Sequence, residues 1–133
     1  MTPRLNPTSG TPLYVQLVER LKHSIAIGAI KAGEQLPSVR KMAETLLINP
    51  NTVVRAYRDL ESEGLVELRH GSGVFVRDSV AGRAGVMRKA DPIVRAVVDR
   101  LESLGLTEDD MRRLLENELG IRREARQARK QRA

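Results

Sequence analysis

The 133-residue sequence predicts an α+β fold, mostly helical, with a main domain followed by a short helical region. Apolar residues recur at helical spacing in five separate segments. Between the third and fourth segments, the pattern changes to the alternation that is typical of strands. We expect the main domain at residues 1–78, a linker at 79–90 and a two-helix region with a basic tail at 91–133.

The first helix is predicted to begin at Thr11-Pro12, a capping hydroxyl followed by proline at the first helical position, and to end at Gly28. The ten residues before this helix are polar and contain prolines, so we expect a loose arm there. The turn signal Lys31-Ala32-Gly33 follows the helix. The apolar stripe of this helix consists of Leu13, Tyr14, Leu17, Val18, Leu21 and Ile25.

Two short helices with a tight connection come next. Pro37-Ser38 opens one of them, with Ser38 as its cap, and Asn49-Pro50 opens the other after only Leu47-Ile48. Gly64 is predicted to end the second helix. A pair of helices joined in this way is the helix-turn-helix pattern. The predicted inner faces are Val39, Met42, Ala43 and Leu46 in one helix and Val53, Ala56, Tyr57 and Leu60 in the other.

A β-hairpin is predicted directly after the helix-turn-helix. Val66 and Leu68 alternate with charged residues, residues 70–73 contain two turn-forming glycines, and residues 74–76 are rich in β-forming side chains. The Gly-x-Gly here lies between two strands, so it does not match a dinucleotide-binding loop, which needs a helix after it. A hairpin in this position is a wing, and the predicted domain is therefore a winged helix-turn-helix.

The region after the wing is predicted to form a dimer interface. Residues 79–90 are rich in glycine and alanine, Asp91-Pro92 is a helix start, and Gly105 ends that helix. Residues 107–110 resemble a capping box with Asp in place of Glu. The two stripes are too apolar to stay alone at the end of a linker, so we expect them to pair with a second copy of the chain. They consist of Ile93, Val94, Val97, Val98, Leu101 and Leu104, then Met111, Leu114, Leu115 and Leu119.

The net charge of +6 is unevenly distributed. Residues 1–78 hold 10 Lys+Arg against 8 Asp+Glu, and residues 79–121 hold 7 against 8. Residues 122–133 hold 6 against 1, so most of the excess is a C-terminal tail. A basic tail can bind any polyanion, and net charge alone does not assign DNA binding to the main domain.

The second helix of the pair has the side chains that DNA recognition needs. At about 100° per residue, Asn51, Arg55 and Arg58 gather opposite the apolar stripe, with Thr52 at the flank. Asparagine can pair with adenine and arginine with guanine. Two alternatives stay open. Either Asn51 and Arg55 hold only the DNA backbone, while Thr52 and the wing select the sequence, or this is an ordinary solvated face.

The first helix of the pair and the wing add further candidates. Arg40 and Lys41 are placed for phosphate contacts, although an ion pair of Lys41 with Glu44 is an alternative. At the wing tip, Arg69 and His70 favour contact with DNA over a purely structural hairpin. The complete set of predicted DNA-binding residues is Ser38, Arg40, Lys41, Asn49, Asn51, Thr52, Arg55, Arg58, Arg69, His70 and Gly71.

Other classes of protein find little support in the sequence. There is no cysteine, and the two histidines lie in unrelated settings, so we expect no metal, no cofactor and no enzyme activity. No signal segment and no apolar run of about 18 residues occurs, which predicts a cytoplasmic protein without a membrane partner. The rival class is a nucleic-acid or protein interaction module that uses the tail residues Arg122, Arg123, Arg126, Arg129, Lys130 and Arg132.

Over about residues 11–77, the sequence resembles the GntR family of bacterial transcription regulators. The motifs that carry this resemblance are Leu36-Pro37-Ser38-Val39-Arg40, Asn51-Thr52-Val53, Ala56-Tyr57, Leu60, Glu63-Gly64-Leu65 and Gly71-Ser72-Gly73-Val74-Phe75-Val76. The resemblance implies that Ser38, Arg40, Asn51, Thr52, Arg55 and Gly71 lie at DNA. It also places His70 at a wing-tip position that enters the minor groove in some members.

The short region after the wing is similar to the YtrA subfamily, in which two short helices serve for dimerisation. This resemblance implies a homodimeric repressor, often at operons for ABC transporters. The two-fold symmetry of such a dimer matches a palindromic operator. Two short helices leave little volume for an apolar ligand pocket. Whether a small-molecule effector exists is therefore open.

Overall fold

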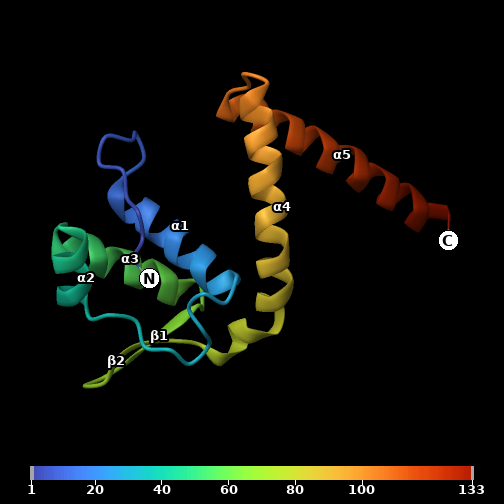
Figure 1. The fold of residues 1–133 in the computed structure, drawn as a ribbon. Coiled ribbons are helices and arrows are strands. Elements are labelled where there is room, and N and C mark those ends of the chain that lie inside the picture. Colours follow the sequence, from blue (N-terminus) through green and yellow to red (C-terminus); the bar gives the residue numbers. More distant parts are fainter. Residues whose placement is uncertain (1, 133) are drawn as a thin grey trace. The chain divides into compact units, whose positions relative to one another are not determined.

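The computed structural model describes residues 2–132 and places them in five α-helices, one 3-10 helix and one β-hairpin (Figure 1). The chain divides into two units, Met1–Asp91 and Pro92–Ala133. The first unit holds α1 (Leu13–Ala26), α2 (Val39–Leu46), α3 (Pro50–Ser62) and the hairpin. This confirms the predicted α+β, mostly helical fold class with a winged helix-turn-helix.

The core of the first unit is built almost entirely from aliphatic side chains. The apolar stripe of α1 packs on α3, and the inner ends of the two strands close the core from the other side. Tyr57 is the one aromatic residue in this cluster of buried residues. The largest fully buried side chains are Leu17, Leu21, Ile25, Val53, Leu60, Val66 and Val76.

The segment before α1 is tied down rather than loose. The backbone N–H of Asn6 donates to Gln16 Oε1 at 2.8 Å, and Gln16 Nε2 donates back to the carbonyls of Asn6 and Thr11 at 2.9 and 2.8 Å. Pro12 occupies the N-cap position without a side-chain cap, so the predicted capping role of Thr11 is wrong. The side chain of Gln16, inside α1, instead joins the preceding segment to the helix.

The helix-turn-helix forms as predicted, with both side-chain caps in place. Ser38 Oγ accepts from the Lys41 N–H at 3.1 Å, and Asn49 Oδ1 accepts from the Asn51 N–H at 2.8 Å. Between the helices, Leu47 takes the left-handed conformation with φ 56°. Tyr57 of α3 then donates its hydroxyl to the carbonyl of Pro37 at 2.7 Å, which fixes the start of α2 against α3.

The wing consists of β1 (Val66–Arg69) and β2 (Gly73–Val76), which pair antiparallel with Val66 opposite Val76. A third segment pairs with the outer side of β2. Val76 N–H donates to the carbonyl of Glu34 at 2.9 Å, and Leu36 N–H donates to the carbonyl of Val74 at 2.8 Å. The sequence predicted only a turn here, because the segment is too short and polar to show a strand pattern.

The predicted linker at 79–90 and helix start at Asp91-Pro92 need correction. A 3-10 helix covers Asp78–Arg83, and α4 runs from Ala84 to Ser103 with Pro92 inside it. Proline inside a helix removes one hydrogen bond. Contacts with α1 support the early turns of α4: Arg88 Nε donates to the carbonyl of Ile27 at 3.0 Å, and His23 Nε2 lies 2.8 Å from Asp91 Oδ1.

The second unit contains the rest of α4 and α5 (Glu108–Arg132). The predicted capping box forms: Asp110 N–H donates to Thr107 Oγ1 at 3.2 Å, and Thr107 N–H donates to Asp110 Oδ2 at 2.9 Å. These hydrogen bonds favour the charged carboxylate and hold the pKa of Asp110 below its usual value. Gly105 lies between the helices with φ 82°, as the predicted helix end requires.

Candidate nucleic-acid interface

The two faces of α3 are divided as the sequence predicted. Val53, Ala56, Tyr57 and Leu60 are buried against α1 and the hairpin. Asn51, Arg55 and Arg58 are exposed on the opposite face, and Thr52 is half-buried at the flank. This face therefore presents one amide and two guanidinium groups, which can donate to base edges and to phosphate oxygens.

Arg55 lies against an aromatic ring from another helix. Its Cζ is 3.7 Å from the centroid of the Tyr14 ring on α1, and its Nη2 donates to Tyr14 Oη at 3.1 Å. The stacked geometry is that of a cation–π interaction. The sequence placed Tyr14 in the apolar stripe of α1 and gave no signal that it meets a residue 41 positions later.

On α2, the candidate residues lie at the N-cap and in the first turn. Ser38 caps the helix, and Arg40 and Lys41 are exposed. Arg40 Nε lies 3.2 Å from Glu44 Oε1. Glu44 therefore pairs with Arg40, whereas the sequence suggested Lys41 as its partner. Both side chains of this pair are largely exposed, and such pairs are weak enough for Arg40 to exchange Glu44 for a phosphate.

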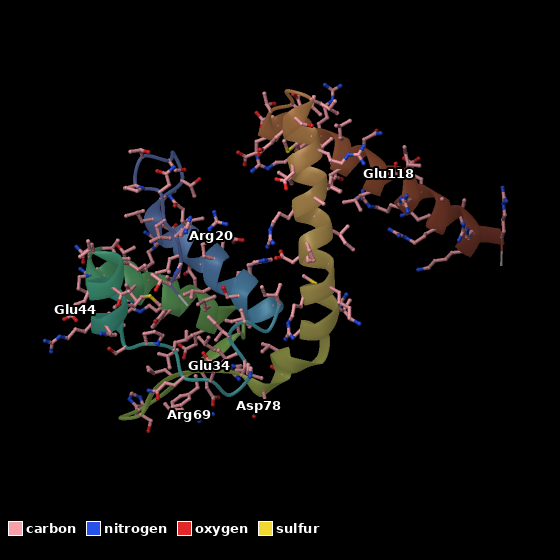
Figure 2. The ribbon with its side chains drawn as sticks, in the orientation of Figure 1. Arg20, Glu34, Glu44, Arg69, Asp78 and Glu118 are labelled. Atoms are coloured by element: carbon pink, nitrogen blue, oxygen red, sulfur yellow. The ribbon has the colours of Figure 1, made fainter. Side chains whose placement is uncertain are left out.

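The wing places its basic residues near the turn between the strands. Arg69, labelled in Figure 2, stacks on Phe75 with its Cζ 4.3 Å from the ring centroid and pairs with Glu67 at 2.7 Å. His70 and Gly71 are exposed in the turn. Gly73 lies so close to Gln35 that an added Cβ would come within 2.5 Å of Gln35 Nε2.

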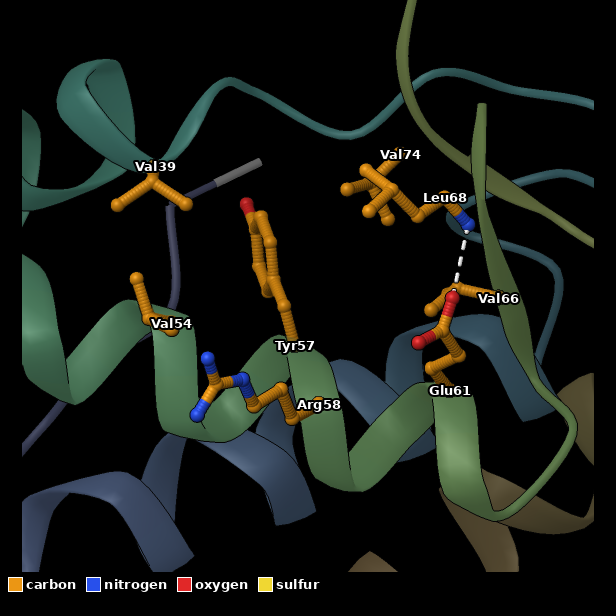
Figure 3. A pocket seen from close by; sticks show the side chains of 8 residues that line it. All are labelled: Val39, Val54, Tyr57, Arg58, Glu61, Val66, Leu68 and Val74. Carbon is orange, nitrogen blue, oxygen red and sulfur yellow. Dashed lines mark hydrogen bonds between the residues drawn. The ribbon is translucent and has the colours of Figure 1, made fainter. Parts of the chain in front are cut away.

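An apolar cleft of about 220 Å³ lies between α3 and the wing (Figure 3). Val54 and Tyr57 of α3 line one side, and Leu68 and Val74 of the strands line the other. Glu61 Oε2 accepts from the Leu68 N–H at 3.0 Å and holds the strand against α3. Val54 and Glu61 had no predicted role, because neither fits the apolar stripe or the basic face of α3.

In the second unit, the residues predicted for dimerisation leave much of their apolar surface exposed. No side chain of α4 or α5 within the described residues is buried. Val98, Leu101 and Met111 are half-buried, while Leu104 is 74% exposed. The others, also exposed, are Ile93, Val94, Val97, Leu114, Leu115 and Leu119.

Residues 2–132 contain no group of three or more His, Cys, Asp or Glu side chains that could hold a metal ion. None of the described helices is long and apolar enough to cross a membrane.

A capped helix with an exposed polar face, preceded by a second helix and followed by a wing, defines a winged helix-turn-helix transcription regulator that binds DNA. Residues 13–76 match the bacterial regulatory proteins of the gntR family. The chain belongs to this family. The resemblance found in the sequence is thereby confirmed.

Two curated relatives and one solved structure illustrate the similarity. The chain is 33% identical over 108 residues to the uncharacterized HTH-type transcriptional regulator YhcF of Bacillus subtilis (strain 168), covering 77% of this chain and 86% of YhcF. It is 40% identical over 76 residues to the HTH-type transcriptional repressor YtrA of the same organism, covering 57% of this chain. That match spans 58% of YtrA, less than two thirds of its length.

The solved structure is the DNA-binding domain of AraR in complex with operator ORX1. It matches with a TM-score of 0.50 and 28% sequence identity. The match covers 55% of this chain and 90% of the AraR domain. A domain with this fold thus binds operator DNA in that protein.

Proposed function

We propose that this protein is a cytoplasmic transcription repressor that binds a palindromic operator as a homodimer. The observation that carries the proposal is the exposed face of α3, where Asn51, Arg55 and Arg58 lie opposite a buried apolar stripe. The AraR–operator complex and the name of the YtrA repressor support DNA binding and repression by the relatives. Both properties are extended to this chain by family membership.

Each element has its own part in the proposed complex. The exposed face of α3 enters the major groove, where Asn51 can pair with adenine. Arg40 and Lys41 of α2 contact phosphates, and the wing brings His70 to the neighbouring groove. The remaining proposed contacts are Ser38, Asn49, Thr52, Arg55, Arg58, Arg69 and Gly71.

The proposed dimer rests on the apolar surface of the second unit. Several large aliphatic side chains on α4 and α5 are half or more exposed, among them Val97 at 50% and Leu115 at 62%. Large apolar side chains left exposed along a helix are typical of an interaction site. A two-fold dimer also matches a palindromic operator with half-sites about one helical turn apart.

Selection of bound duplexes from a random pool tests the DNA-binding part directly. We expect an enriched sequence with two inverted half-sites, bound equally well by a variant that ends at residue 121. That truncation removes six Lys+Arg of the tail. Loss of all specific binding on truncation would instead favour the rival function, a polyanion-binding module built on the tail.

The Asn51→Ala variant, measured on every single-base variant of the selected operator, tests base reading. We expect a relaxed preference at one or two base pairs in each half-site, at a cost of about 1–3 kcal/mol on the preferred sequence. A uniform loss over all variants, with the preference unchanged, would move Asn51 to the residues that contact phosphate.

The Leu115→Asp variant tests the dimer by sedimentation at micromolar concentration. We expect it to weaken both self-association and operator binding, because it places a charge in the apolar stripe of α5. Asn117→Asp is the matched control, since Asn117 is an exposed polar residue of the same helix and receives the same charge. A wild-type monomer that binds the palindrome tightly would refute the homodimer.

A further inference from the structure

The contact between Tyr14 and Arg55 joins α1 to the exposed face of α3. Two interactions act on the same guanidinium group: stacking at 3.7 Å on the Tyr14 ring and a hydrogen bond to its hydroxyl at 3.1 Å. Arg55 is exposed and Tyr14 is only half-buried, so neither side chain is needed to fill the core. The contact therefore orients Arg55 more than it stabilises the fold.

The direction of the contact distinguishes Arg55 from its neighbours on α3. At about 100° per residue, Arg55 lies about 40° from Asn51 on the side that turns to α1, and Arg58 lies about 20° from Asn51 on the other side. Arg58 lines the cleft between α3 and the wing (Figure 3). Arg55 is thus held at the α1 edge of the exposed face, whereas Asn51 and Arg58 occupy its centre and wing side.

The donors that remain free at this edge suit a phosphate oxygen. Tyr14 Oη accepts from Arg55 Nη2, so its own O–H proton is left to donate. The guanidinium keeps its other N–H groups. An edge position on a groove-binding helix faces the phosphate wall of the groove rather than the bases, and phosphates accept most of the hydrogen bonds that proteins donate to DNA.

We propose that Tyr14 is a positioning residue that holds Arg55 at the α1 edge of the recognition helix, and that the two side chains together bind one DNA phosphate in each half-site. This inference rests on the proposed function. It assigns Arg55 to the DNA backbone, which is the alternative that the sequence left open, and not to guanine. Pre-ordering the long arginine side chain reduces the rotamer entropy lost on binding.

A double-mutant cycle on the full-length dimer tests the inference. We expect Arg55→Ala to weaken binding about tenfold on the operator and on an unrelated duplex alike, and to lower the salt slope by about one per half-site. Tyr14→Phe keeps the ring and loses only the hydroxyl, so it lowers the affinity for DNA less than Tyr14→Leu does. In the Arg55→Ala background, Tyr14→Leu has little further effect.

Arg58→Ala provides the matched control, because Arg58 lies on the same helix but on the wing side. We expect the fold-losses in DNA affinity of Tyr14→Leu and Arg58→Ala to multiply in the double variant, as they do for independent sites. A melting temperature for each variant identifies any loss of folding, and Tyr14→Phe preserves the ring if the leucine variant does not fold.

Three results would overturn the inference while the proposed function stands. One is a Tyr14 effect that is equally large with and without Arg55. Another is that Arg55→Ala weakens binding only to the operator, not to the unrelated duplex, and alters the base preference. The third is unchanged binding by the Tyr14 variants while Asn51→Ala still relaxes base preference, which refutes the role of Tyr14 and leaves the proposed function intact. A wild-type protein that binds no duplex refutes both.

Discussion

Tyr57 offers the sharpest test of how the helix-turn-helix is held together. Its ring is buried in the core, and its hydroxyl donates to the carbonyl of Pro37 at 2.7 Å. Pro37 precedes the cap of α2, so this hydrogen bond fixes the start of α2 to the middle of α3. Tyr57→Phe removes the bond and leaves the ring and its packing in place.

The expected cost follows from the surroundings of the two groups. A hydrogen bond of this kind contributes about 1 kcal/mol net, and the cost rises to about 3 kcal/mol if the carbonyl stays without a partner. Pro37 is exposed, so water can replace the lost donor and the lower value applies. For a domain of this size, about 1 kcal/mol lowers the melting temperature by about 4–8 °C.

The same variant has a defined pH dependence. Burial disfavours the ionised phenol and raises the pKa of Tyr57 in the folded protein. In the unfolded chain the tyrosine ionises near pH 10, so its contribution to stability is complete below that pH and is lost as the pH rises above it. Phenylalanine cannot ionise, and the variant therefore lacks this part of the alkaline destabilisation.

Urea unfolding at pH 8 and at about pH 10.5, followed by far-UV circular dichroism, measures both effects. Tyr14→Phe is the control, because it removes the only other tyrosine hydroxyl of the chain from a half-buried position. A Tyr57→Phe protein as stable as the wild type at pH 8, with the same alkaline loss, would refute the reasoning.

Two further predictions concern α2 and the wing. Arg40→Ala is expected to leave folding intact and to weaken binding similarly on all sequences, with a salt slope lower by about one per half-site; unchanged operator affinity in an anisotropy titration would remove Arg40 from the site. Gly73→Ala, at φ 121° and with Gln35 Nε2 2.5 Å from the added Cβ, is expected to destabilise the protein by about 1–3 kcal/mol. Gly71→Ala, at φ 76° with no atom within 4 Å of the added Cβ, should cost less, and the melting temperatures of the two variants measure the difference.

The sequence predicted those parts of the fold that local patterns determine. The caps at Ser38 and Asn49 form because a short polar side chain precedes a helical stripe, a signal contained within four residues. The division of α3 into a buried and a polar face follows from its 3.6-residue period. Strand alternation and two glycines were likewise sufficient to predict the hairpin.

The features that sequence analysis missed depend on contacts between distant segments. The strand-like pairing of Glu34 and Leu36 exists only because β2 supplies the partner carbonyl and N–H groups. The early start of α4, eight residues before Pro92, coincides with contacts to α1 made by Arg88 and Asp91. Both contacts cross more than 60 residues of sequence, and a local proline signal cannot reveal them.

On α5, leucines and arginines share one helix face, and this limits the proposed dimer contact. At about 100° per residue, Leu115, Leu119, Arg122, Arg126 and Arg129 lie within a sector of about 80°. Burying guanidinium groups without partners is costly, so an apolar contact along this face must end near Arg122. There Arg122 pairs with Glu118 at 2.7 Å within the helix. The proposed dimer interface should therefore be complete by residue 121, and removal of the basic tail should not dissociate the dimer.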